Sequence, residues 1–280
     1  MEGCPIIKRI GVASAFSPRF LPVLSDAARM AERLGSTLTF LHAGPHSKEA
    51  DQRFLTAVQD LNVQSAASLV YKDGNGVVDS ILSMVRSESI DLLIAGALER
   101  ETTGRQFLGN VARTLLRNAP CPLLLFTHPK IVGTKFKKIV VATDFSEESR
   151  KALDLAHWLA QRDQAECLYV FSIFTPFNVA RRKAQTQRLL ESGTSDEETD
   201  RLEAFVAHLE HSDVPIDFRV IRATTGFSAS EFVKGVEADL LIMPARRTEQ
   251  GVAFPPYMDW VFQVIPANLW ILSFPEENGL

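Results

Sequence analysis

The chain has 280 residues, of which 46% are hydrophobic and 23% charged, and its formal net charge is −4. This composition excludes disordered and fibrous proteins, and a net negative charge provides no long-range attraction for nucleic acid or an anionic membrane. The first residues lack a basic and apolar leader pattern, and no segment reaches the ~18 apolar residues of a membrane span. We therefore expect a cytoplasmic protein with no nucleic-acid or membrane partner. Cys4, Cys121 and Cys167 are far apart and form no Cys-x-x-Cys pair, which is typical of reduced structural thiols.

The first half of the chain alternates between strand and helix patterns. An apolar run within 8–17 ends in a polar turn, where Ser17 is expected to cap a helix with Pro18 at its first position and Gly35 at its end. Apolar residues at helical spacing predict that one face of this helix packs on a sheet. The next expected elements are a strand at Thr37–His42, a helix at about 47–60, a strand at 66–71, a helix at 77–88, a strand at Asp91–Ala95, and a helix followed by a last strand within 118–126.

The second half repeats this order. Residues 137–146 resemble residues 8–17, and Ser146 is expected to begin the next helix. The acidic stretch at 191–200 is interpreted as a solvated, mobile loop. The next expected elements are a strand at Glu166–Phe171, a helical region at 178–210, a strand at 216–221, a helix at 227–237, a strand at Asp239–Met243, and a last strand within 265–272.

Strands that alternate with helices predict a parallel sheet covered on both faces. The fold class is therefore α/β, with two tandem doubly wound parallel five-stranded sheets in Rossmann-type three-layer α/β/α domains. We predict one domain at 1–128, a linker at 129–136 that contains Pro129 and Gly133, and a second domain at 137–280.

A ligand site in such a sheet lies outside the carboxyl ends of the strands, where the strand order reverses. The two loops that meet there follow the first strand, at 14–17 or 143–146, and the fourth strand, beginning at Gly96 or Pro244. A phosphate bound at this point needs closely approaching backbone N–H groups at a helix N-terminus, which glycine permits and bulky residues obstruct.

Three stretches carry a resemblance to a known family: Val-Ala-Thr-Asp-Phe-Ser at 141–146, Asp-Leu-Leu-Ile-Ala-Gly at 91–96, and the longer segment at 107–125. Nearly the whole chain resembles a tandem universal stress protein. The resemblance implies an adenine nucleotide alpha hydrolase-like fold for each half. In ATP-binding members it also implies a fourth-strand loop of the form Gly-x2-Gly-x9-Gly-Ser/Thr and an acidic residue at the end of the first strand.

The first copy keeps part of that pattern. Gly96 and Gly109 stand at the matching spacing, but Glu99 replaces the second glycine, Asn110 replaces the hydroxyl residue and Ala15 replaces the aspartate. A carboxylate close to phosphates repels them unless a metal intervenes. The nucleotide-binding candidates implied in this copy are Ser14, Ala15, Ala43, Gly96, Glu99, Gly109, Asn110 and Val111.

The second copy keeps the complementary part. Asp144 is present and Val170 occupies the position that contacts adenine in the family, but Pro244 and Arg247 replace the first two glycines and two further prolines align with the end of the loop. Proline donates no N–H, so this loop is not expected to hold a triphosphate in the family's manner. The weaker nucleotide-binding candidates here are Thr143, Asp144, Val170, Arg246 and Arg247, and the two arginines alternatively form another anion site or a solvated surface pair.

The departures from the nucleotide-binding pattern in the two copies favour a non-enzymatic stress-response or regulatory protein with degenerate nucleotide sites and no catalytic residues. The resemblance implies that the two domains pack as an intramolecular pseudo-dimer through their last strands, with a homodimer and an unidentified protein partner as further expectations. The alternative is a nucleotide-switched sensor that binds ATP with Mg in the first copy and hydrolyses it slowly. Its weak point is Ala15, which can be neither a general base nor a metal ligand.

Other constellations give weaker signals. His208 and His211 stand at i, i+3, a spacing compatible with a metal, but surface histidines are the favoured interpretation and no metal is expected. His42 and His157 are interpreted as packed or solvent-tipped side chains and not as catalysts. An apolar stretch at 252–262 permits an apolar ligand or a protein partner without indicating either.

Overall fold

The computed structural model describes residues 7–13, 15–63, 67–74, 76–97, 99–102, 105–174, 195–209, 212–222, 227–254 and 265–275. The chain forms two compact units, which do not coincide with its two sequence repeats. One unit contains Pro5–Lys135 together with Ala245–Phe254 and the described part of Asn268–Leu280, and the other is built mainly from Phe136–Pro244. Segments of the second repeat therefore complete the unit that holds the first repeat.

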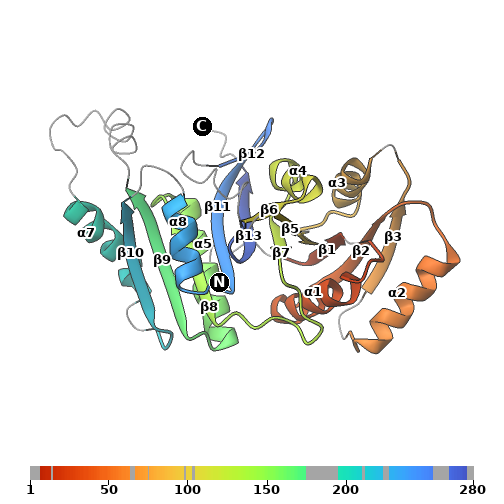
Figure 1. Ribbon diagram of the computed structural model, residues 1–280, viewed down its shortest axis with the longest axis horizontal. Helices are drawn as coiled ribbons and strands as arrows, with labels where there is room; N and C mark the ends of the chain where they lie inside the picture. The colour runs from red at the N-terminus through yellow and green to blue at the C-terminus, as the bar shows by residue number, and fades with distance from the viewer. Residues whose placement is uncertain are drawn as a thin grey trace. The chain divides into compact units, whose positions relative to one another are not determined.

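The unit of the first repeat is a sheet between two layers of helices. Its strand order is β3-β2-β1-β4-β7-β13, with β1 parallel to both β2 and β4, β7 parallel to β4, and β13 antiparallel to β7. Helices α1 and α2 cover one face and α3 and α4 the other (Figure 1). The elements are β1 Arg9–Ala13, α1 Phe20–Leu34, β2 Thr37–Ala43, α2 Lys48–Asp60, β3 Ala67–Lys72, α3 Val77–Ser87, β4 Leu92–Gly96, β5 Glu99–Thr102, β6 Arg105–Leu108, α4 Asn110–Asn118, β7 Leu123–Phe126 and, from the second repeat, β13 Asn268–Pro275.

The second unit has the same layers. Its strands follow the order β10-β9-β8-β11, and they pair in parallel. Helix α8 lies on one face of this sheet and α5 on the other (Figure 1). The elements are β8 Lys138–Thr143, α5 Glu147–Asp163, β9 Cys167–Phe174, α7 Ser195–Val206, the short 3₁₀ helix η1 Ala207–Leu209, β10 Ile216–Arg222, α8 Phe227–Gly235, β11 Leu240–Thr248 and β12 Gly251–Ala253, and β11 runs beyond Pro244 into the other unit.

The central strands form the core because helices cover both of their faces. Every residue from Leu92 to Ala95 is buried, as is every residue from Ile139 to Thr143. Such continuous apolar runs are typical of parallel strands. The predicted α/β fold class is confirmed. Among the described residues, no helix is both long enough and apolar enough to cross a bilayer.

The start of α1 differs from the prediction. The helix begins at Phe20, because residues 17–19 form a turn in which the Ser17 carbonyl accepts a hydrogen bond from the Phe20 N–H at 2.9 Å. Arg19 occupies the N-cap position and makes no side-chain cap. The predicted end is correct, since Gly35 has a left-handed backbone with φ 66°.

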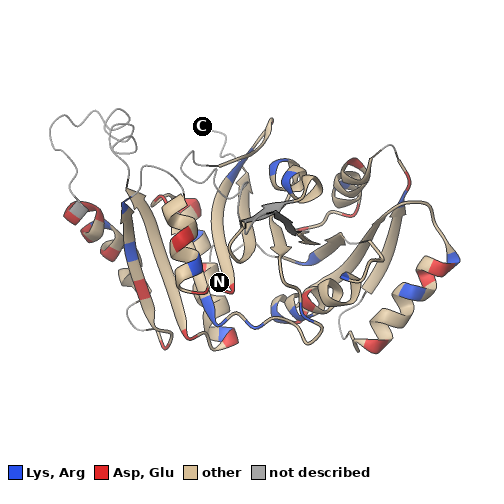
Figure 2. Cartoon of the chain, in the orientation of Figure 1, with Lys and Arg blue, Asp and Glu red and all other residues tan. Residues whose placement is uncertain are grey.

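The predicted loop at 191–200 is wrong for its second half. Residues 191–194 lie outside the described part of the chain, but Ser195–Val206 form helix α7 instead of a loop. Its first turn contains three acidic residues, seen as red segments in Figure 2. Negative charge at this position interacts favourably with the positive end of the helix dipole. Leu202 and Phe205, one turn apart, are buried and anchor the helix.

The predicted linker is held against α1. The buried carboxylate of Asp26 accepts hydrogen bonds from the backbone N–H groups of Lys130, at 2.9 Å, and Thr134, at 2.5 Å. Burial raises the pKa of this carboxyl group, although these hydrogen bonds oppose the shift. Arg33 donates to the Thr134 carbonyl at 2.7 Å. Residues 130–134 therefore belong to the compact unit of the first repeat.

Candidate functional site

The candidate site of the first repeat lies at the carboxyl ends of β1 and β4. These strands are neighbours in the sheet, with Ala13 opposite Ala95, and the strand order reverses between them. This is the switch point at which doubly wound sheets bind ligands. Ser14, which follows β1, lies outside the described residues.

Aromatic side chains occupy the first-strand side of this site. The Phe16 ring packs against Phe20, Phe40 and His42, with ring centroids 4.8, 5.5 and 5.1 Å apart. Ala15 is exposed and supplies no carboxylate, so an apolar cluster stands next to the position where the family has an aspartate.

One side chain connects the two loops of the first site. Arg19 Nη1 donates to the carbonyl of Ala97, which follows β4, at 2.7 Å. Arg19 was not among the predicted site residues. Its distance from Ala97 along the chain gives no local signal, and only the pairing of β1 with β4 brings the two residues together.

The fourth-strand loop of the first repeat folds as a β-hairpin. Strands β5 and β6 pair antiparallel from Glu99 opposite Leu108 to Thr102 opposite Arg105. Backbone groups that pair in such a ladder are not available to a phosphate. The hairpin was not predicted, and it occupies the segment that corresponds to the glycine-containing loop of ATP-binding relatives.

The two matching glycines have ordinary structural roles. A Cβ on Gly96 would lie 2.9 Å from Val23 Cγ2, so the absence of a side chain lets α1 pack closely on β4. Gly109 is the N-cap of α4 and has an extended backbone with φ −63°, which any residue adopts. Asn110 and Val111 are exposed at the first turn of α4, and Ala43 is half-buried at the end of β2.

A polar cluster that the sequence analysis missed lies at the ends of β2 and β3. Asp51 accepts a hydrogen bond from the Tyr71 hydroxyl at 2.6 Å and contacts His46 Nε2 at 2.9 Å. The Tyr71 hydrogen bond lowers the pKa of Asp51, and burial together with Asp51 raises the pKa of Tyr71 to about 12. Burial lowers the pKa of His42, which stands opposite Tyr71 in the strand register.

The loop after the first strand of the second repeat is held by hydrogen bonds between its own residues and the start of α5. Asp144 Oδ1 accepts hydrogen bonds from the Ser146 N–H, the Ser146 hydroxyl and the Ser149 hydroxyl, at 3.0, 2.5 and 2.7 Å. This carboxylate therefore organises the start of α5. Thr143 and Val170 are buried in β8 and β9.

The arginines of the second repeat belong to the other compact unit. Arg246 is exposed on β11, and Arg247 Nη1 donates to the carbonyl of Pro120. The structure gives Arg247 a partner in the first repeat, which no local sequence signal indicates.

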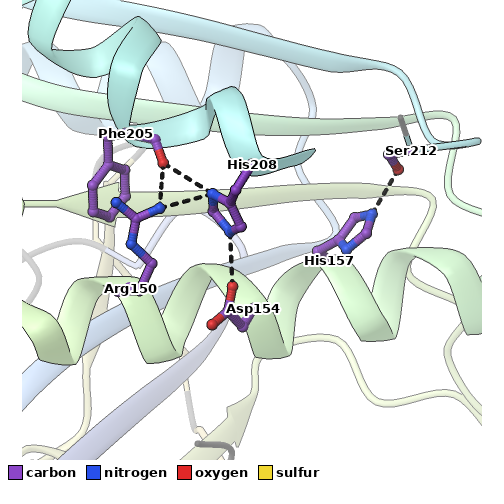
Figure 3. A network of polar contacts seen from close by, with 6 residues as sticks. All are labelled: Arg150, Asp154, His157, Phe205, His208 and Ser212. Atoms are coloured by element: carbon purple, nitrogen blue, oxygen red, sulfur yellow. Dashed lines mark hydrogen bonds and ion pairs between the residues drawn. The ribbon is translucent and has the colours of Figure 1, made fainter. Parts of the chain in front are cut away.

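A network of polar contacts joins α5 to η1 (Figure 3). Arg150 Nη1 donates to the Phe205 carbonyl at 2.6 Å and lies 2.7 Å from His208 Nδ1, while His208 Nε2 lies 2.9 Å from Asp154. The Arg150 guanidinium also lies over the Phe205 ring, 4.2 Å from its centroid. Among the described residues, no group of three or more His, Cys, Asp or Glu side chains could hold a metal ion. His211 lies outside them.

In each unit, mostly parallel strands with helices on both faces and a candidate site at the strand ends define a doubly wound α/β domain. Residues 7–127 and 135–254 match the model of the universal stress protein family. The chain therefore belongs to this family and carries two of its domains in tandem, as the resemblance predicted.

Solved structures share this fold over nearly the whole chain. A universal stress protein from Archaeoglobus fulgidus DSM 4304 is 14% identical with a TM-score of 0.66, and the match covers 95% of this chain and 98% of that chain. A functionally unknown protein from Pseudomonas aeruginosa PAO1 is 18% identical with a TM-score of 0.71, and the match covers 95% of this chain and 92% of that chain. Among curated proteins, none matches this chain.

Proposed function

We propose that this chain is a non-enzymatic stress-response or regulatory protein of the universal stress protein type, in which both nucleotide sites are degenerate. The observation that carries the proposal is the β5–β6 hairpin. In the first repeat, residues 99–102 pair with residues 105–108, within the loop that in ATP-binding relatives leads from the fourth strand to the phosphate-binding helix N-terminus.

Two further contacts support the proposal for the first repeat. Arg19 spans from the first-strand loop to the Ala97 carbonyl, and the Phe16 ring packs on Phe40 and His42 beside it. A nucleotide bound in the family's manner would compete with both contacts. Ala15 leaves the site without the family's acidic residue.

The second repeat supports the proposal through different losses. The Asp144 carboxylate accepts three hydrogen bonds from Ser146 and Ser149, so it is already engaged at the start of α5. Pro244 lies within β11, which continues to Thr248 and pairs with β12. The fourth-strand loop is thus a hairpin in this repeat as well.

The proposal includes packing of the two repeats as an intramolecular pseudo-dimer. Its support is the antiparallel pairing of β13 with β7, in which Trp270 stands opposite Leu124. The Thr127 N–H also donates to Asn268 Oδ1, at 2.9 Å and buried from solvent. Pairing the last strands removes exposed edges that would otherwise invite aggregation.

Calorimetric titration of the intact chain with ATP and magnesium tests the proposal. We expect no heat of binding from the parent chain or from the variant Gly109→Glu, and no ADP when the same samples are analysed by chromatography. The variant places a carboxylate at the N-cap of α4, where it would oppose a bound phosphate.

The alternative is an ATP-binding sensor that uses the first repeat. Gly96 and Gly109 are retained, and Asn110 is exposed at the first turn of α4. Micromolar binding that Gly109→Glu abolishes would establish this alternative. Binding that the variant leaves intact would place a working nucleotide site elsewhere in the chain and would equally contradict the proposal.

A further inference from the structure

The hairpin after the fourth strand of the second repeat is packed into the unit of the first repeat. The end of β11 pairs antiparallel with β12, with Arg246 opposite Ala253 and Thr248 opposite Gly251. Residues 245–254 belong to the compact unit built on Pro5–Lys135. We call residues 245–253 the clasp hairpin.

Arg247 connects the clasp hairpin to the end of α4. Its Nη1 donates to the carbonyl of Pro120, two residues beyond the last residue of the helix. Its Nε is buried and has no hydrogen-bond partner among the described residues. Burial of this donor costs solvation free energy, which the close packing has to offset. A cation at the C-terminal end of a helix also interacts favourably with the helix dipole.

Gly251 gives a second, independent contact between the same elements. A Cβ on this residue would lie only 2.4 Å from the carbonyl oxygen of Arg117, in the last turn of α4. Its φ of 119° is also a conformation that residues with side chains rarely adopt. The hairpin can therefore lie this close to α4 only because glycine occupies this position.

The charges on α4 exclude a conventional ion pair as the reason for the contact. The helix carries Arg113 and Arg117 and no acidic residue, as the blue colouring of α4 in Figure 2 indicates. Arg247 is thus held by hydrogen bonding to a backbone carbonyl and by the close packing of the hairpin on α4. This arrangement is typical of a structural contact and not of general charge attraction.

We infer that the clasp hairpin is an intrachain interaction surface whose partner is the C-terminal end of α4. The loop that holds phosphates in ATP-binding relatives is then used in the second repeat to fix a helix of the first repeat. Helix α4 begins at Gly109, so the clasp also fixes the turn at the candidate site of the first repeat. The inference holds whether or not that site binds a nucleotide.

Hydrogen exchange followed by mass spectrometry on the intact chain tests this inference. Arg247→Met keeps the length of the side chain but removes its donors, and Arg246→Met is the matched control, since neighbouring strand residues point to opposite faces. In Arg247→Met we expect amides of the last turn of α4 and of the clasp hairpin to exchange about tenfold faster or more, the effect of losing one hydrogen bond from a charged group. In Arg246→Met we expect parent rates at both places.

Each other outcome overturns the inference. Equal exchange in the two variants would mean that Arg247 has no special role, and equal acceleration in α4 and in β8 of the other unit would mean general unfolding. Gly251→Ala tests the same contact independently of Arg247, because the added Cβ of residue 251 would push the hairpin away from the Arg117 carbonyl. Parent exchange rates in α4 of Gly251→Ala would contradict the clasp independently of Arg247.

Discussion

At the scale of single residues, the surroundings of His157 shift its pKa. Its Nε2 lies 2.6 Å from the hydroxyl of Ser212, and the two residues form a pair beside the contacts of His208 in Figure 3. Burial lowers the pKa of His157, the nearby His208 lowers it further, and Asp154 opposes the shift. His157 is half-buried, which agrees with the sequence-based interpretation of a packed or solvent-tipped side chain.

The lowered pKa of His157 predicts a loss of stability on acidification. The unfolded chain binds a proton near pH ~6.5, whereas the folded chain resists protonation to a lower pH. This contribution to the free energy of unfolding is therefore present above pH ~6.5 and is lost as the pH falls toward the lowered pKa. We expect His157→Gln to have a flatter pH profile than the parent in urea unfolding between about pH 8 and pH 5.

His42 provides a check on this prediction. Burial lowers its pKa too, so its contribution has the same sign. The double variant His42→Gln/His157→Gln should therefore have the flattest profile of all. Parallel profiles for the parent and His157→Gln would show that this histidine does not contribute to the pH dependence.

At the scale of elements, the two serines expected to begin helices differ. Ser146 caps α5, because its hydroxyl oxygen accepts a hydrogen bond from the Ser149 N–H at 3.2 Å. Ser17 does not cap α1, and its hydroxyl accepts a hydrogen bond from the Arg19 N–H within the preceding turn, at 3.3 Å. Both serines follow a phenylalanine after the first strand of their repeat, but Pro18 follows Ser17 whereas Glu147 and Glu148 follow Ser146 in the first turn of α5.

This difference predicts unequal effects of one substitution. Ser146→Ala should lower the free energy of unfolding by about 1 kcal/mol, the usual cost of a lost N-cap. Ser17→Ala is the matched control and should change it by no more than about 0.5 kcal/mol, as surface substitutions usually do. Urea denaturation of both variants measures the two effects, and equal losses would contradict the assignment of the caps.

At the scale of the whole molecule, segments of the second repeat complete the unit of the first repeat. Strand β13 comes from the end of the second repeat but pairs with β7 of the first, and Asn268 accepts the Thr127 N–H. The clasp hairpin adds a second segment to the same unit. The stability of the first repeat therefore depends on residues that follow it by more than a hundred positions.

Trp270→Ala tests this dependence. Trp270 is fully buried on β13 opposite Leu124, so its truncation should lower the free energy of unfolding by about 3–5 kcal/mol. Hydrogen exchange should accelerate in β7 and β4 of the first repeat. Phe171→Ala, a truncation of a buried residue on β9, is the control and should accelerate exchange in β8 and β10 instead. The same pattern of exchange in both variants would contradict the composite unit.

The sequence by itself determined the class of fold and the position of most elements. The apolar runs at β1, β4, β8 and β11, the stop at Gly35 and the cap at Ser146 are local signals, because strand burial and helix ends depend on neighbouring residues. The departures from the family's glycine pattern were also visible, since Glu99 and Pro244 stand at fixed distances from recognisable strands.

Only the tertiary structure decided what fills the candidate sites. Arg19 meets Ala97, Tyr71 meets Asp51, and Arg247 meets Pro120 because strand pairing and helix packing bring distant segments together. The hairpins within the two fourth-strand loops were equally invisible, because short strands of mixed polarity carry little periodicity. The strands depend on local sequence, whereas the contacts that occupy the sites depend on tertiary packing between segments that are distant in the sequence.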